Sequence, residues 1–150
     1  MSAPNRRRGH DAERAVVRYL KTQGFPDACT TRAKLGHDGA TAPGDIDFHP
    51  LICLEVKDVA ASAWPTWCRQ AAAEAPTGTV PVVVRRTRGV PDPGLWECRV
   101  YQWGWLGIVG DLAAFRFHGH ACTVDETIWW AFPLADLVAA VRAIDAEATA

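Results

Sequence analysis

The first stretch of regular hydrophobic spacing in the chain predicts an amphipathic helix. Within residues 11–23 the apolar side chains of Val16, Val17 and Leu20 recur at helical spacing and form one stripe. Gly24 follows this stripe and is suited to end the helix, since glycine readily adopts the left-handed conformation found after helix C-termini.

The segments that follow are predicted to be short strands around a second helix. Residues 45–48 and 51–57 flank a His-Pro turn and predict a β-hairpin, and the second arm is almost continuously apolar, as expected of a central strand. The other expected elements are a strand at 29–32, an alanine-rich helix at 66–75, and strands at 80–86 and 96–102. The predicted order over the first 102 residues is therefore α-β-β-β-α-β-β.

The last third of the chain has a less regular pattern. Residues 103–109 and 127–132 are apolar and aromatic, and Pro133 is placed to open a final helix. The apolar face of that helix would consist of Leu134, Leu137, Val138, Val141 and Ile144. The chain holds seven tryptophans, which we expect mostly in a core or an interface, with base stacking by one of them as the alternative.

The composition is that of a globular, water-soluble domain. The chain has 150 residues, of which 49% are hydrophobic and 22% charged, so a single domain with a real core is expected. No apolar run is long enough to span a bilayer, and residues 1–10 lack the apolar segment of a signal peptide. The five cysteines include no CxxC pair, which favours free thiols and predicts a cytoplasmic location.

Two acidic positions and one lysine in the predicted hairpin indicate chemistry. Glu55 and Lys57 are two residues apart in a strand, so both side chains point to the same face. A simple salt bridge would explain these two residues alone. A hairpin also brings Asp45 near Glu55, and two converging carboxylates repel each other unless a cation lies between them. Such an oxygen-rich site suits Mg²⁺.

Roles for these residues follow from that arrangement. A bound metal would polarise a phosphodiester and activate water, and Lys57 would orient that water or stabilise the charge of the transition state. Asp47 competes with Asp45 for the metal, because both lie on one face of the same arm. We prefer Asp45, which follows the Pro-Gly turn, and keep Asp47 as a secondary group.

The segment Pro43-Gly44-Asp45, followed after nine residues by Glu55-Val56-Lys57, resembles the signature of the PD-(D/E)xK nucleases. The departure is Gly44, which separates the proline from the acid. The first helix of that superfamily usually carries a metal-site glutamate, and the matching residue in Gly9-His10-Asp11-Ala12-Glu13-Arg14 is Glu13. A first-turn glutamate favoured by the helix dipole is the alternative for Glu13.

The resemblance is strongest to Holliday-junction resolvases of the archaeal and phage type, and it covers roughly residues 5–102. It implies an α/β fold with a restriction-endonuclease-like core, in which a mixed central sheet is flanked by helices. It also implies Mg²⁺ as cofactor, with Mn²⁺ as a substitute, and a glutamine on the helix after the signature, matched here by Gln70. Residues 103–150 match no part of the pattern and are expected to form a helical extension.

The same resemblance implies DNA as the partner, in branched or four-way-junction form, and a homodimer to match the two-fold symmetry of a junction. The net charge of −1 does not indicate nucleic acid by itself, but the basic residues gather in the first two thirds. The expected DNA contacts are Arg6, Arg7, Arg8, Lys34, Arg69, Arg85, Arg86 and Arg88. Two alternatives remain: another DNA nuclease of the same fold, and a non-catalytic DNA-binding protein with a nuclease-like core.

Overall fold

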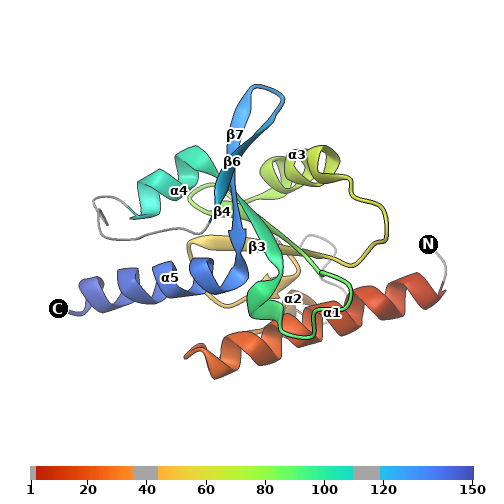
Figure 1. Cartoon of the computed structure of the whole chain (residues 1–150). Helices are drawn as coiled ribbons and strands as arrows, with labels where there is room; N and C mark the ends of the chain where they lie inside the picture. The colour runs from red at the N-terminus through yellow and green to blue at the C-terminus, as the bar shows by residue number, and fades with distance from the viewer. Residues whose placement is uncertain (1–2, 36–43, 110–118) are drawn as a thin grey trace.

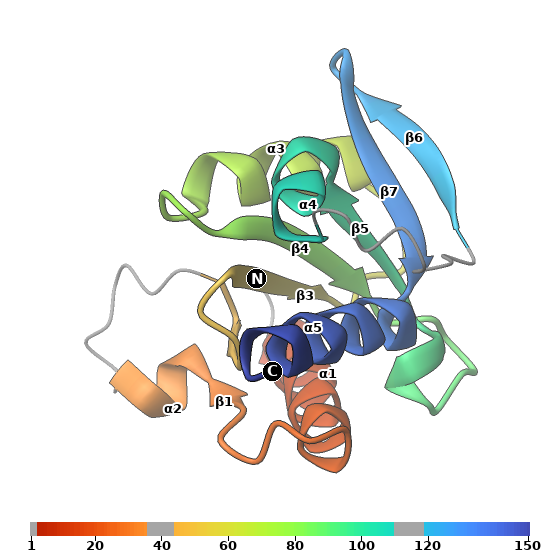
Figure 2. The same ribbon diagram turned by 90° about the vertical axis from the view of Figure 1, so that its left-hand side faces the viewer.

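In a computed structural model, one mixed β-sheet runs through the chain with helices packed on both of its faces (Figures 1 and 2). The structure describes residues 3–35, 44–109 and 119–150, so Pro43 of the signature lies outside the described residues. The expected α/β class is confirmed, and within the described residues the sheet has seven strands.

The helices and strands have the following bounds. The helices are α1 (Ala3–Thr22), α2 (Thr31–Leu35), α3 (Trp64–Glu74), α4 (Gln102–Val109) and α5 (Leu134–Ala148), with a 3-10 turn η1 (Pro93–Leu95). The strands are β1 (Cys29–Thr30), β2 (Ile46–Asp47), β3 (Ile52–Lys57), β4 (Val80–Arg85), β5 (Glu97–Tyr101), β6 (His120–Val124) and β7 (Thr127–Pro133). Among the described residues, no helix is long and apolar enough to cross a bilayer.

The strand order is β1-β2-β3-β4-β5-β7-β6, with β3 near the middle. Only β3 and β4 pair in parallel, and α3 is the crossover between them, while the other neighbours are antiparallel. The predicted order of elements over the first 102 residues is confirmed, with two short additions, α2 and the 3-10 turn η1. The expected strand at 29–32 ends at Thr30, and the short helix α2 begins at Thr31.

Successive side chains of β3 point to opposite faces of the sheet. Ile52, Leu54 and Val56 belong to the larger core, which also contains the buried stripe of α1 and the apolar face of α5. The side chains of Cys53, Glu55 and Lys57 therefore point to the opposite face, where α3 packs over Val83 of β4. The central strand thus presents apolar side chains to one layer of helices and its two charges to the other.

The C-terminal third corrects the expectation of a helical extension. Strands β6 and β7 form a hairpin, and β7 pairs with β5, so the sheet continues across the expected boundary at residue 102. Asp125 and Glu126 turn the hairpin with φ angles of 48° and 64°, which fits the twist of a two-residue turn. The final helix is confirmed, because α5 begins directly after Pro133 and buries Leu134 and Leu137.

Three of the four tryptophans between residues 103 and 130 lie in the core or pack against it. Trp105 and Trp129 are 1% and 2% exposed, and Trp130 packs partly buried against the larger core. Trp103 alone of these four is largely exposed, at 67%. Of the core and the interface expected for the tryptophans, the core is therefore the place of Trp105 and Trp129.

Replacing Trp129 should test whether the β6–β7 hairpin is integral to the fold. Its ring contacts Tyr101 edge-on at a centroid distance of 5.6 Å and lies in the cluster under α3. Trp129→Ala should lower the free energy of unfolding by about 3–5 kcal/mol, as for other large core aromatics. Trp103→Ala should change it by less than about 0.5 kcal/mol. Urea unfolding measures both, and similar losses for the two variants would contradict this account of the core.

Candidate active site

The backbone at Gly44 and Asp45 lies unusually close to β3. Gly44 has a φ of +69°, and a Cβ at this position would stand 2.9 Å from the carbonyl oxygen of Leu54. Only glycine fits here without moving the backbone. The inserted glycine that departs from the PD-(D/E)xK pattern thus has a physical role, which is to let the chain lie against β3.

Three hydrogen bonds hold this segment in place. The Asp45 amide donates to the Leu54 carbonyl at 2.7 Å, and the Thr31 amide donates to the Asp45 carbonyl at 3.0 Å. The Thr31 hydroxyl also donates to the carbonyl of Gly44 at 2.8 Å. Asp45 is therefore tied to β3 on one side and to the start of α2 on the other.

The Asp45 side chain is fixed as firmly as its backbone. Its Oδ2 accepts a hydrogen bond from the Val56 amide at 2.8 Å, which places the carboxylate beside β3. The pKa of Glu55 responds both to the charge of Asp45 and to a hydrogen-bonding contact between the two carboxyl groups. The hairpin geometry expected for Asp45 and Glu55 is therefore present.

Glu55 is a buried acid with one positive partner. The residue is 8% exposed, and Lys57 Nζ lies 3.4 Å from its Oε2. Burial raises the pKa of Glu55, the negative charge of Asp45 raises it further, and Lys57 opposes both. Lys57 is at the end of β3, with a side chain 20% exposed, so its ammonium can reach both Glu55 and solvent.

Glu13 approaches Asp45 from α1. It is 8% exposed, and burial followed by the charge of Asp45 raises its pKa from 4.5 to about 7. The guanidinium of Arg32 is 3.7 Å from Glu13 Oε2 and opposes this shift. Asp45 therefore acts on a buried glutamate from α1 and on another from β3.

These acids offer oxygen ligands but not a complete coordination shell. Among the described residues, no three acidic, histidine or cysteine side chains are grouped closely enough to hold a metal ion by themselves. Mg²⁺ commonly binds through one or two carboxylates and keeps several waters. Asp45 and Glu55 fit that mode, with Glu13 as a more distant acid.

The remaining residues expected at the site have other partners. Gln70 is exposed on α3 and donates to Glu74 at 3.2 Å. Asp47 is ion-paired with Lys34, and Arg69 pairs with Asp125 at 2.8 Å near the β6–β7 turn. The structure thus joins Glu13, Asp45, Glu55 and Lys57, and it leaves these other groups engaged elsewhere.

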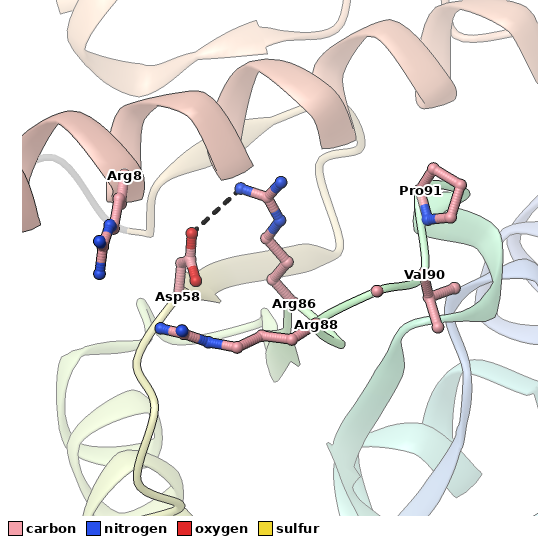
Figure 3. Close-up of a pocket in the computed structure, with 7 residues that line it drawn as sticks. Arg8, Asp58, Arg86, Arg88, Val90 and Pro91 are labelled. Atoms are coloured by element: carbon pink, nitrogen blue, oxygen red, sulfur yellow. Dashed lines mark hydrogen bonds and ion pairs between the residues drawn. The ribbon is translucent and has the colours of Figure 1, made fainter.

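The expected DNA-contacting arginines fall into two groups. Arg6, Arg7 and Arg8 are exposed on α1. Arg85 stands beside Lys57 in the β3–β4 pair and donates to the Ala60 carbonyl at 3.1 Å. Arg86 and Arg88 meet Arg8 around one open pocket (Figure 3).

Sequence reasoning missed the cation next to Glu13. Arg32 contacts Nε2 of His10 as well as Glu13, and these residues line a hollow with Arg14 and Thr30. Arg32 carries no sequence signal, because it belongs to the short helix α2 that the pattern did not predict. His10 precedes Glu13 by three residues on one helix, so its proximity could have been inferred from spacing.

Comparison with known proteins adds no relative, since no family model, curated protein or solved structure matches the chain.

The pKa of Glu13 predicts how the stability of the metal-free protein depends on pH. The pKa of Glu13 is higher in the folded state than the usual 4.5, so the folded protein holds this proton more tightly than the unfolded chain does. The contribution of Glu13 to the free energy of unfolding is therefore greatest below pH 4.5 and is lost as pH rises through about 7. The stability of the wild type relative to Glu13→Gln should therefore fall between these values. Thermal unfolding with a chelator present measures the difference, and a difference constant with pH would contradict the prediction.

Proposed function

We propose that this protein is a metal-dependent nuclease of the PD-(D/E)xK type that hydrolyses DNA phosphodiester bonds. The observation that carries the proposal is the fixed carboxylate of Asp45, held by the Val56 amide at 2.8 Å beside Glu55, which in turn lies 3.4 Å from Lys57. Asp45 and Glu55 would hold Mg²⁺ or Mn²⁺, with Glu13 assisting.

A salt bridge between Glu55 and Lys57 explains less of the site. It would leave unexplained why Asp45 and Glu13 are directed at the same place, where their charges raise the free energy of the ionised site. Lys57 is the ion-pair partner of Glu55, and Arg32, with Arg14 acting as well, offsets the charge of Glu13. Among the described residues Asp45 has no cation as an ion-pair partner, and a carboxylate beside a buried acid favours a bound cation.

Each residue then has a distinct task. When bound, the metal would polarise the phosphodiester and make water more acidic. Lys57 is placed to donate a hydrogen bond to the attacking water or to a phosphate oxygen as negative charge develops there. Arg32 would keep Glu13 partly ionised and so able to accept a hydrogen bond or a proton from water.

The arrangement of elements also supports the proposal. A helix, an antiparallel three-strand segment, a crossover helix and a strand parallel to the third are the core that the PD-(D/E)xK resemblance implies. Here these elements are α1, β1–β3, α3 and β4. The acids and Lys57 lie on the first helix and around the third strand, as in the motif.

Substitution of the acids should separate cleavage from folding. Asp45→Asn and Glu55→Gln should abolish Mg²⁺-dependent cleavage of DNA while leaving DNA binding near normal, because the amides keep the shape but weaken the metal site. Asp27→Asn, at an exposed position in the turn after α1, is the matched control and should retain activity. Cleavage at the wild-type rate by either active-site variant would rule out this site.

Lys57→Ala should lower the cleavage rate by about 100-fold or more, on the scale of losing one electrostatic or acid–base group. Lys21→Ala, exposed in the last turn of α1, is the control for loss of a lysine charge. Circular dichroism should show both variants folded. An unfolded Lys57→Ala protein would favour a purely structural ion pair.

We further propose a preference for four-way junctions and a homodimer, on the strength of the resemblance to junction resolvases and the two-fold symmetry of the substrate. The exposed side chains of Trp103 and Leu106, 67% and 44% exposed on α4, are an apolar surface that a second copy could cover. With Mg²⁺ present, the protein should cut a junction faster than linear duplex or flap DNA. Sedimentation should give a dimer at micromolar concentration, and a monomer that cuts all three substrates equally would leave a general DNA nuclease.

A further inference from the structure

Three arginines from distant parts of the chain line one open pocket. Arg8 comes from α1, and Arg86 and Arg88 come from the loop after β4 (Figure 3). Asp58, directly after β3, lies among them, and Gly89, Val90 and Pro91 complete the wall. The pocket has a volume of about 580 Å³, and the catalytic residues described above do not line it.

Arg86 is held in a defined position. Its Nη1 lies 3.1 Å from Oδ2 of Asp58, whose side chain is only 5% exposed. Its guanidinium also lies over the ring of Trp96, 5.8 Å from the centroid. An arginine positioned from two sides loses little side-chain freedom when it binds a ligand.

Arg88 is presented by a turn whose shape is also defined. The Val90 amide donates to the Thr87 carbonyl at 3.2 Å, and Gly89 takes a φ of +79° at the third position of this turn. The indole nitrogen of Trp96 donates to the Val90 carbonyl at 2.8 Å and fastens the turn to the core. The same buried tryptophan thus organises both Arg86 and Arg88.

The charges of the pocket select for a doubly negative ligand. Arg86 has Asp58 as its counter-charge, whereas within the described residues neither Arg8 nor Arg88 forms an ion pair. Three guanidinium groups and one carboxylate leave a net charge of about +2. A phosphate monoester carries about −1.5 to −2 near pH 7, and a phosphodiester carries a single charge, so the monoester is the better match.

The pocket is close to the proposed catalytic centre. Arg8 precedes Glu13 by five residues of α1, or about 7–8 Å along the helix axis. Asp58 follows Lys57 in sequence, and the Arg86 amide donates to the Lys57 carbonyl at 2.9 Å. Five residues also turn the helix by about 140°, so Arg8 and Glu13 project from different sides of α1, and one strand of DNA would have to pass around this helix to meet both.

We propose that Arg8, Arg86 and Arg88 form a binding site for a terminal phosphate monoester of the DNA strand, with Asp58 as the buttress of Arg86. This inference rests on the proposed nuclease function, because it makes the pocket part of the same substrate site. It gives the substrate class a more exact form: DNA that bears a phosphorylated end near the scissile bond.

Binding measurements on the Asp45→Asn full-length chain test the site without cleavage. Fluorescence anisotropy would compare short duplexes with 5′-phosphate, 3′-phosphate or only hydroxyl ends. One phosphorylated end should bind about tenfold tighter than the hydroxyl end, since charge-assisted contacts to guanidinium groups are strong. Inorganic phosphate should compete better than chloride at equal ionic strength. Which end is preferred identifies the polarity of the bound strand.

Two variants and one control assign that preference to the pocket. Arg8→Ala and Arg88→Ala, both at exposed positions, should remove the preference for the phosphorylated end while keeping the thermal unfolding transition. Arg18→Ala is the control, because Arg18 is exposed on the same helix and does not line the pocket. It removes the same charge and should keep the preference.

The outcomes distinguish this inference from the proposed function. Equal affinity for phosphate and hydroxyl ends, or a preference that survives both pocket variants, would overturn the inference even in an active nuclease. A uniform loss of affinity for every duplex in Arg88→Ala would assign the pocket to internal phosphodiesters and would also overturn it. A phosphate preference that depends on Arg8 and Arg88, in a wild type that never cuts DNA, would support the pocket and refute the nuclease.

Discussion

The hydrogen bond from the Val56 amide to the Asp45 carboxylate completes a strand and positions an acid at the same time. Among residues 44–57, pairing between β2 and β3 reaches from Leu54 only as far as Ile46 and the Asp45 backbone, so the next amide of β3 on that edge has no backbone partner there. Val56 is a buried residue, and an unsatisfied amide there would be costly. The side chain of Asp45 supplies the missing acceptor at 2.8 Å. The requirements of the sheet therefore hold a carboxylate next to Glu55, whatever that carboxylate binds.

The fixed position of the Asp45 carboxylate affects the ionisation of both buried glutamates. Asp45 has a structural partner in the Val56 amide, while Glu13 and Glu55 are buried with a cation at one side and Asp45 at the other. The raised pKa values of the two glutamates are the consequence, since burial and a nearby negative charge both disfavour ionisation. An asparagine at position 45 could still accept from Val56, so the sheet and the charge can be separated experimentally. The fold needs an acceptor at this position, whereas a metal site needs the negative charge.

Rules of local sequence spacing predicted that Asp45, Glu55 and Lys57 lie together. The features that they did not predict depend on contacts between segments far apart in the sequence or on patterns too short to recognise. The two-residue period of a strand placed Glu55 and Lys57 on one face, and the turn at His49 and Pro50 brought Asp45 alongside. Arg32 could not be foreseen, because it approaches Glu13 through α2, whose five residues are too few to give a periodic pattern. The pairing of β7 with β6 and with β5 was missed because β7 is apolar on both faces, being covered by helices and by neighbouring aromatics. Gln70 illustrates a signal that was present but unused: α3 buries Trp64, Trp67, Cys68 and Ala71, and position 70 falls outside that stripe.

The small net charge of the chain conceals two local fields of opposite sign. Asp45 links Glu13 of α1 and Glu55 of β3 into one acidic group, while Arg8 of α1 meets Arg86 and Arg88 of the loop after β4. Arg8 and Glu13 share α1, Glu55 lies on β3, and Arg86 and Arg88 follow β4 in a turn that Trp96 holds to the core, so the separation of the two groups is set by ordered backbone. Screening over about 8–10 Å at physiological ionic strength leaves such neighbouring clusters distinct but still able to act on one extended ligand.

A ligand that carries phosphates at intervals along a chain can contact the basic pocket with one phosphate and, through a cation, the acidic centre with another. A total charge of −1 is therefore compatible with a polyanionic partner, because the relevant quantity is the order of charges along α1 and β3.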